Sequence, residues 1–220
     1  DMTGQFFMQD LKKAGIDTDS DRKMDEAGVS GKCLVFVTPD ADRSMNTFLG
    51  VSAALDASFV SEQAIRRSEY IYLEGYLVTA DNSRRAVLLA REFARKHQVK
   101  IALTLSDPSM MMYFREGMLE MIGDGVDLLF ANEEEAFGLC GSRDLDTTIE
   151  KMKGYAKTFA ITRGKEGAVL YDGDSIIHIR PNPVKAIDTL GAGDMFAGAF
   201  LYGLTHAMDF QQAGDFASMT

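Results

Sequence analysis

The sequence has few of the features that mark secreted, membrane-bound or nucleic-acid-binding proteins. It holds two cysteines, Cys33 and Cys140, too few for a disulfide framework, so we expect free thiols in a reducing compartment. No apolar run reaches the roughly 18 residues of a membrane span, and no signal peptide opens the sequence. Lys/Arg-rich runs are missing and the net charge is -10, which disfavours nucleic acid as a partner. We therefore expect a soluble cytoplasmic protein that binds neither membranes nor nucleic acid.

Other catalytic patterns are missing as well. The three histidines are scattered along the sequence and suggest neither a metal cluster nor a catalytic triad. There is no Gly-x-Ser-x-Gly elbow and no Walker A loop. A nicotinamide dehydrogenase would need a Gly-x-Gly-x-x-Gly turn with an acidic residue about 20 positions later, and none is found.

What is present is an ordinary globular composition, 46% hydrophobic and 25% charged, enough for one substantial core. From residue 61 onward, apolar strands alternate with helices of about ten to sixteen residues. This rhythm predicts an α/β fold with a mostly parallel sheet and helices on both faces. The expected strands are 70–75, 100–105, 126–131 and 158–162, followed by a hairpin of 168–171 with 176–179. The expected helices are 61–68, 82–97, 109–122, 133–139 and 145–155, with two final helices that begin at 192 and 210.

The first part of the chain does not share this rhythm. Residues 1–15 predict an amphipathic helix that ends in glycine. The polar, turn-rich segment that follows contains two short expected strands, 31–38 and 45–51. We assign residues 1–15 and 52–220 to an α/β core and residues 16–51 to a small β lid.

The most informative stretch is Asp188-Thr-Leu-Gly-Ala-Gly-Asp194, which runs directly into small and apolar residues. Gly191 and Gly193 flank Ala192, a pattern that predicts a glycine turn opening into a buried helix. Free N–H groups at a helix N-terminus bind anions, and a carboxylate beside a bound anion is unfavourable unless it has a chemical role. Asp194 fits a base that takes a proton from a hydroxyl while the N–H groups hold a phosphoryl group. The alternative is a tight turn in which Asp194 only interacts favourably with the helix dipole.

A second motif, Asn132-Glu-Glu-Glu135, directly follows an expected strand, where parallel sheets bind their ligands. Glu135 could help to hold a magnesium ion, directly or through water, because magnesium prefers carboxylates and retained waters. Capping of the next helix by Asn132 and Glu135 would explain both residues without a metal. We expect Glu133 and Glu134 to face solvent.

Three further stretches of the chain hold candidate residues. In Thr162-Arg-Gly-Lys-Glu-Gly167, Gly164 and Gly167 permit positive φ, and the Thr162 hydroxyl could reach a phosphate, although a plain hairpin loop is the alternative. Arg43, on a turn beside the lid, could swing over phosphates, although a solvated turn arginine fits equally well. Asp107 ends a strand and fits either a place near the site or a helix N-cap.

These motifs together resemble one family. The stretch 188–194 resembles the C-terminal signature of the ribokinase-like (PfkB) sugar and nucleoside kinases, 132–135 matches their Asn-x-x-Glu motif, and 162–167 resembles their nucleotide loop. Residues 33–50 and 73–76 resemble the adenosine-kinase-like branch in particular. The resemblance spans nearly all of the chain, in the family's order.

The resemblance implies a ribokinase-like fold and an ATP-dependent kinase that phosphorylates a primary hydroxyl of a nucleoside or sugar, adenosine or ribose-like. It implies that Asp194 is the base that deprotonates this hydroxyl. The N–H groups around Gly191, Ala192 and Gly193 would form the anion hole for the transferred phosphoryl group. Arg43 resembles the lid-side arginine that reaches the phosphates in nucleoside-kinase members.

The same resemblance assigns the nucleotide and metal contacts. Asn132 and Glu135 would set the magnesium ion and the phosphates, while Thr162, Gly164 and Gly167 would lie along the nucleotide. Many members use a monovalent cation beside the anion hole. Its ligands here would be the residues that match at 188 and 190, namely the Asp188 carboxylate and the Leu190 carbonyl, so potassium activation is a hypothesis.

Two departures from the family pattern bear on function. The usual first strand with a substrate-binding Asp and the Gly-Gly-x-x-x-Asn segment are not found, and the chain stops inside what resembles a penultimate helix, so we expect both ends of the family domain to be missing. A fructose- or ketohexose-type sugar kinase is an alternative, as is a catalytically silent nucleotide-binding relative, although the intact Asp194 argues against the latter. Lid strands in this family often pair between subunits, but Leu34 and Phe36 could equally cover the protein's own cleft.

Overall fold

The computed structural model describes residues 1–18, 28–38, 43–185 and 188–220. The chain forms two compact units, Asp1–Leu55 and Asp56–Thr220. Residues 1–15, which the sequence analysis groups with the core, share their unit with the expected lid strands. We therefore describe the two units separately.

The first unit contains a helix and a β-hairpin, whose elements are α1 (Met2–Lys13), β1 (Lys32–Val37), β2 (Arg43–Phe48) and the 3-10 helix η1 (Gly50–Ala54). Asp1 caps α1 by accepting the Gly4 N–H at 2.9 Å, and its other oxygen accepts the Ser30 N–H at 2.9 Å. This single carboxylate thus ties the start of the helix to the segment that enters β1. The two strands pair antiparallel, with Lys32 opposite Phe48, which agrees with the small β sheet expected from the sequence.

The second unit is built on one sheet. Among the described residues its six strands follow the order β3-β4-β5-β6-β7-β8, with β3 to β6 parallel and the last two antiparallel. This confirms the predicted mostly parallel sheet and its terminal hairpin. The strands are β3 (Tyr70–Glu74), β4 (Lys100–Thr104), β5 (Val126–Asn132), β6 (Ala156–Thr162), β7 (Ala168–Tyr171) and β8 (Ile176–Ile179).

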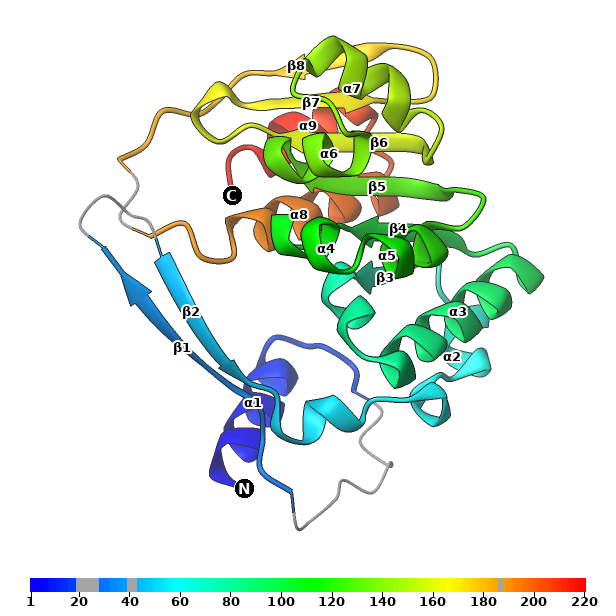
Figure 1. Ribbon diagram of the computed structural model, residues 1–220, viewed down its shortest axis with the longest axis vertical. Coiled ribbons are helices and arrows are strands. Elements are labelled where there is room, and N and C mark those ends of the chain that lie inside the picture. The colour runs from blue at the N-terminus through cyan, green and yellow to red at the C-terminus, as the bar shows by residue number, and fades with distance from the viewer. Residues whose placement is uncertain (19–27, 39–42, 186–187) are drawn as a thin grey trace. The chain divides into compact units, whose positions relative to one another are not determined.

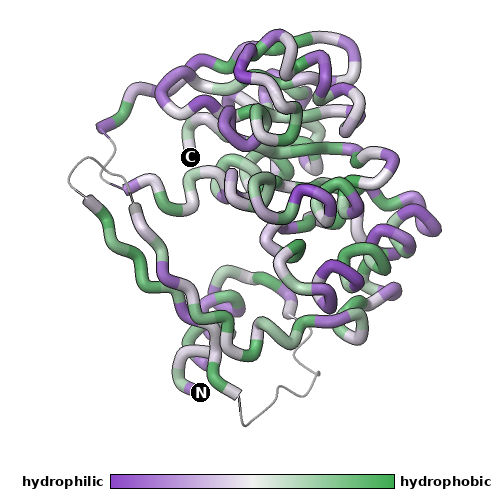
Figure 2. Tube along the Cα trace, in the orientation of Figure 1, coloured by the Kyte–Doolittle hydropathy of each residue, from purple (hydrophilic) through white to green (hydrophobic). Residues whose placement is uncertain are grey.

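Helices cover both faces of this sheet (Figure 1). One core cluster packs Val87, Met118 and Leu139 against strand residues such as Leu103 and Leu129, while α8 and α9 pack against the opposite face. Figure 2 shows the hydrophobic residues concentrated along the strands. The helices are α2 (Glu62–Arg66), α3 (Asp81–Lys96), α4 (Pro108–Tyr113), α5 (Arg115–Ile122), α6 (Glu133–Cys140), α7 (Leu145–Met152), α8 (Ala192–Thr205) and α9 (Phe210–Ala217).

One expected helix is wrong. The sequence predicts a continuous helix over 109–122, but the chain breaks at Phe114, whose φ of -129° and ψ of 26° lie outside the helical region, so that α4 and α5 are separate. Tertiary packing explains the break: Met110 and Met111 of α4 are buried, and the Arg115 guanidinium donates to the Leu139 carbonyl of α6 at 3.0 Å. A break without glycine or proline has no local signature.

In the part of the chain that the structure describes, no helix combines the length and apolar character needed to cross a bilayer.

Candidate active site

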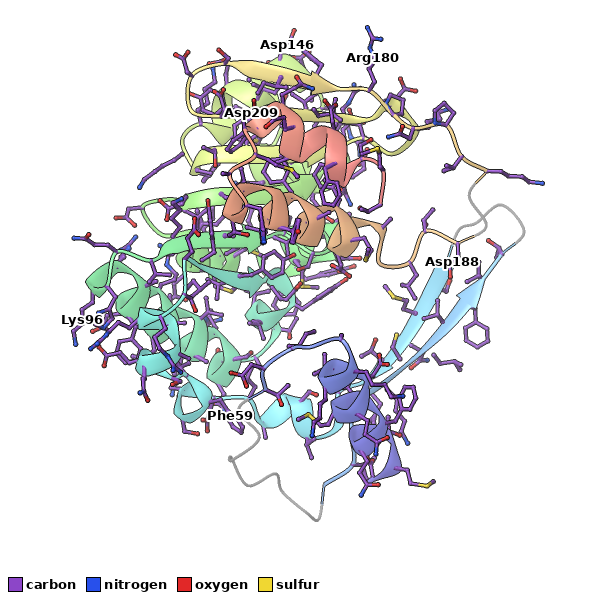
Figure 3. All side chains as sticks on the ribbon, turned by 180° about the vertical axis from the view of Figure 1, so that it is seen from behind. Phe59, Lys96, Asp146, Arg180, Asp188 and Asp209 are labelled. Atoms are coloured by element: carbon purple, nitrogen blue, oxygen red, sulfur yellow. The ribbon has the colours of Figure 1, made fainter. Side chains whose placement is uncertain are left out.

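The N-terminus of α8 has the geometry expected of an anion hole. Gly191, the N-cap, has a φ of +75°, a left-handed conformation that favours glycine. Just before it, the Asp188 carboxylate accepts the Leu190 N–H at 2.8 Å and fixes the turn; Figure 3 labels Asp188 in this segment. No described residue accepts a hydrogen bond from the N–H groups of Gly193 and Asp194. These two donors are therefore available to an anion. The Ala192 N–H, which the sequence analysis placed in the anion hole, instead donates to the Thr189 carbonyl at 3.3 Å, so the predicted donor set is wrong at this residue and shifts to Gly193 and Asp194.

The Asp194 side chain is exposed and lies near the carboxyl ends of the parallel strands. Burial raises the pKa of Glu74, at the end of β3, and the negative charge of Asp194 raises it further. Burial likewise raises the pKa of Tyr76 to about 12, with smaller contributions from Asp107, Glu135 and Asp194. The charge of Asp194 therefore acts on residues at the edge of the sheet where parallel strands bind ligands.

Asn132 and Glu135 form a reciprocal capping box at the start of α6. The Asn132 side chain accepts the Glu135 N–H at 2.8 Å, and Glu135 accepts the Asn132 backbone N–H at 2.9 Å and its side-chain amide at 2.7 Å. Glu135 is only 5% exposed, and burial raises its pKa to about 7, with further increases from the charges of Asp107 and Asp194. The capping role considered from the sequence is therefore present, whatever else the carboxylate does.

The glycine loop follows β6 beside this cap. Thr162 is the residue opposite Asn132 in the parallel pairing of β5 with β6, so the two motifs meet at one point of the sheet edge. Gly164 and Gly167 both have positive φ, +53° and +83°, as the sequence predicts. The expectation that Glu133 faces solvent holds in part, because its side chain is half-buried and its carboxylate accepts from the Arg163 guanidinium at 2.7 Å.

Other candidates are placed as follows. Asp107 caps α4 by accepting the Ser109 N–H at 2.7 Å, so its N-cap role is present. Glu134 is exposed and pairs with Arg143. Arg43 begins β2, and its side chain lies outside the described residues.

Sequence reasoning assigned no role to a polar network at the ends of β3 and β4. Glu74 is half-buried, and the Ser106 hydroxyl lies 3.2 Å from its Oε2. Burial also strongly raises the pKa of Tyr72, whose hydroxyl lies among Glu74, Thr104 and Asp194. Asn132 became a candidate because it stands at the end of an expected strand. Glu74 is an acidic residue at the end of a buried strand, so the same rule would have identified it from the sequence.

A groove of about 670 Å³ lies at the opposite, amino edge of β4, β5 and β6. Its central acid, Asp127, is already engaged: it accepts from the Lys157 ammonium at 2.7 Å and from the Ile101 N–H at 2.8 Å. The groove contains none of the candidate residues. The carboxyl edge of the sheet is therefore the stronger candidate for the active site.

Comparison with known proteins decides the family. The pattern of the pfkB family carbohydrate kinases matches residues 1–220, the entire chain. The chain belongs to this family. The predicted ribokinase-like fold and the resemblance stated from the motifs are thereby confirmed. PfkB membership makes the chain a carbohydrate-kinase type phosphotransferase with a hydroxyl acceptor.

Individual PfkB relatives are similar over nearly the whole chain. It is 28% identical over 230 residues to 5-dehydro-2-deoxygluconokinase 1 of Bacillus cereus, covering 97% of this chain and 68% of that protein. It is 29% identical over 231 residues to the 5-dehydro-2-deoxygluconokinase of Clostridium tetani, covering 99% of this chain and 68% of that protein. The chain thus spans about two thirds of the length of these relatives.

Solved structures agree with the fold. A probable sugar kinase from Rhizobium etli superposes with a TM-score of 0.93 at 30% identity, covering 99% of this chain and 66% of that one. The adenosine kinase from Sinorhizobium meliloti superposes with a TM-score of 0.92 at 31% identity, covering 99% and 67%. These relatives act on different acceptors by their names, so similarity alone leaves the acceptor of this PfkB chain open.

Proposed function

We propose that the full-length protein transfers the γ-phosphoryl group of ATP to a primary hydroxyl of a neutral nucleoside or sugar. The observation that carries this proposal is the start of α8, where the Asp194 carboxylate stands beside two N–H groups that no described residue accepts, and where its charge acts on Glu74 at the carboxyl end of β3. A base and an anion hole at one helix terminus are what phosphoryl transfer to an alcohol requires.

In the proposed reaction, Asp194 takes the proton of the acceptor hydroxyl. The hydroxyl oxygen then forms a bond to the γ-phosphorus, the bond from that phosphorus to the β–γ bridging oxygen breaks, and ADP leaves. The N–H groups of Gly193 and Asp194 would hold the phosphoryl oxygens as the phosphoryl group passes between the two oxygens. The exposure of Asp194 suits this role, because its carboxylate is open to an approaching acceptor hydroxyl.

The residues at the cap of α6 fit a magnesium ion that accompanies the nucleotide. Glu135 offers hard oxygen ligands, and each of its oxygens accepts one hydrogen bond, which leaves lone pairs for a water held by the metal. Bound magnesium would neutralise phosphate charge. Thr162, Gly164 and Gly167 would lie along the nucleotide, with Thr162 next to Asn132 at the sheet edge. Arg43 would approach the phosphates from the lid.

The charge of the described site favours a neutral acceptor. Glu74 stands near Asp194, and both would repel a sugar acid, whereas a carboxylate readily accepts hydrogen bonds from the hydroxyls of a nucleoside or neutral sugar. A fructose- or ketohexose-type acceptor also satisfies this condition. Free Cys33 and Cys140 are consistent with the reducing cytoplasm in which we place the protein.

The test is a kinase assay of the full-length protein with ATP and magnesium against adenosine, inosine, D-ribose, D-fructose and 5-dehydro-2-deoxy-D-gluconate. We expect a neutral acceptor to have the highest kcat/KM. Asp194→Asn should lower kcat by about 10² to 10⁴, the range for loss of a general base, and leave nucleotide affinity almost unchanged.

Asp146→Asn is the matched control. Asp146 is also an exposed acid in the first turn of a helix, α7, but it lies well apart from Asp188 (Figure 3). This variant removes the same interaction with a helix dipole and should keep full turnover. Near-normal kcat in Asp194→Asn, or equal losses in both variants, would show that Asp194 is only a first-turn acid.

A further inference from the structure

Ser106 occupies a strained turn at the carboxyl end of β4. Its φ is +70°, a left-handed value that a residue with a Cβ adopts at a cost, and the Asp107 N–H donates to the Leu105 carbonyl across it at 2.9 Å. A γ-turn with positive φ is rare and strained. Such strain is found mainly where surrounding interactions impose it, often at functional sites.

The hydrogen bonds of Ser106 show what imposes the turn. Its hydroxyl accepts the Gly75 N–H at 2.8 Å, its carbonyl accepts the Tyr76 hydroxyl at 3.2 Å, and its N–H donates to the Thr104 hydroxyl at 3.2 Å. The β3 end lies so close to β4 that a Cβ on Gly75 would be 2.6 Å from the Leu105 carbonyl oxygen. The ends of the two strands are therefore joined through one serine.

The direction of the Ser106 hydroxyl proton follows from this arrangement. Because the oxygen already accepts the Gly75 N–H, the hydroxyl proton is free to donate, and Glu74 Oε2 lies 3.2 Å away. One carboxylate oxygen of Glu74 is thereby held. The Tyr72 hydroxyl also acts on this carboxylate, and the two Glu74 oxygens together keep lone pairs for a substrate hydroxyl.

We propose that Ser106 is a positioning residue that holds the Glu74 carboxylate as a hydrogen-bond acceptor for the alcohol substrate. This inference rests on the proposed kinase function and adds a determinant of acceptor binding to it. The strain of the γ-turn is retained because the backbone must pass close enough to β3 for one hydroxyl to contact both Gly75 and Glu74.

The charges around Glu74 explain why a donor is needed there. Burial is the main effect that disfavours the ionised form of Glu74, and the charge of Asp194 on α8 adds to it, whereas the hydroxyls of Ser106 and of Tyr72 favour that form. Glu135 of α6 acts on Tyr72. Without the Ser106 hydroxyl, Glu74 should bind a proton at higher pH and then donate where the substrate needs an acceptor.

The experiment compares Ser106→Ala, Ser106→Gly and Ser106→Thr in the full-length protein, with the best acceptor from the panel above. Ser106→Ala should raise KM for the acceptor roughly 10-fold, as expected for a lost hydrogen bond to a charged group, while kcat at saturation changes by less than about twofold. The acid limb of the kcat/KM profile should move to higher pH. Ser68→Ala, a serine at the end of α2, controls for the substitution itself and should change neither parameter.

The glycine and threonine variants separate the hydroxyl from the strain. Ser106→Gly relieves the left-handed strain and removes the hydroxyl, so it should raise KM as much as Ser106→Ala does although it folds more readily. Ser106→Thr keeps the donor and should retain most of the acceptor affinity, although its β-branched side chain adds strain at this φ and should lower the Tm. If Ser106→Gly behaves like the unaltered protein, the residue serves only the backbone and the proposal is wrong.

A measurement without substrate completes the test. Carbon-13 NMR of glutamate-labelled protein, with the Glu74 signal assigned by its loss in Glu74→Gln, should show that Glu74 titrates at higher pH in Ser106→Ala. An unchanged titration would overturn the proposal even if Asp194→Asn confirms the kinase reaction. Conversely, normal turnover in Asp194→Asn would refute the kinase mechanism, while a shifted Glu74 titration would still support the contact with Ser106.

Discussion

Gly193 offers a substitution whose effects on stability and on activity should have opposite signs. It is the second residue of α8, its φ is not positive, and a Cβ built there meets no heavy atom within 4 Å. Alanine at this position is therefore free of strain and of steric overlap. Because alanine favours a helix over glycine by up to about 1 kcal/mol, and less near a helix end, Gly193→Ala should stabilise the protein by about 0.5 kcal/mol. The corresponding rise in Tm is about 1–2 °C.

Activity should move the other way. The added methyl group extends into the open space beside the N–H groups of Gly193 and Asp194, where the proposed phosphoryl group must approach closely. Loss of one donor of an oxyanion-type hole lowers turnover by about 10² to 10³, equivalent to about 2.7–4 kcal/mol. We therefore expect Gly193→Ala to be slightly more stable and at least about 100-fold less active in a coupled assay of ADP release.

The control lies in the same helix. Gly198 is exposed in α8, and a Cβ there also meets nothing within 4 Å. Gly198→Ala should gain stability without loss of turnover, which separates helix propensity from the approach of the phosphoryl group. A fully active Gly193→Ala protein with the expected gain in stability would refute the anion hole at this helix terminus.

Three other predictions follow from charge and exposure. Burial raises the pKa of Glu135 in the folded protein to about 7, above its ordinary value of 4.5. Between these two pH values the folded protein holds a proton on Glu135 that the unfolded chain has lost. The free energy of unfolding should therefore fall by up to about 3 kcal/mol as pH rises from about 4.5 to about 7. In Glu135→Gln, urea unfolding measured without metal should no longer show this pH dependence of the unfolding free energy. An unchanged pH dependence would contradict the burial of the acid. If Asp188 helps to hold a monovalent cation, turnover in potassium should exceed turnover in a large organic cation, and equal rates would reject the site. Leu34 and Phe36 lie on one face of β1 and are 60% and 59% exposed. If lid strands pair between subunits, the double variant Leu34→Ser with Phe36→Ser should convert a dimer to a monomer in analytical sedimentation. Retention of the dimer would exclude this surface as the interface.

The regular part of the fold could be predicted because its hydrophobic periodicity is strong. Alternating apolar strands and amphipathic helices define β3 to β8 and most helices to within a few residues. The candidate residues that follow strands directly, such as Asn132 and Thr162, meet at one edge because parallel strands end on the same side. Periodicity and strand direction were therefore enough to predict the position of most candidate site residues.

The rest depends on contacts between distant segments, which periodicity does not encode. The pairing of Glu133 with Arg163 arises only when β5 and β6 lie side by side. The break at Phe114 follows from packing of α4 on α6. The positive φ of Ser106 could not be predicted either, because serine is not a residue that favours the left-handed region. The grouping of residues 1–15 with the hairpin likewise rests on the Asp1 contacts to Ser30, 29 positions away.

The capping box at α6 affects how distant relatives of this chain should be judged. Asn132 and Glu135 form the N-terminal cap of a helix, so a related protein that has lost catalytic activity would still be selected to retain both residues for folding. Gly193 has no such structural role, because alanine at this position would make the helix more stable. In a divergent sequence, survival of that destabilising glycine is thus better evidence of a working enzyme than survival of the asparagine and glutamate pair.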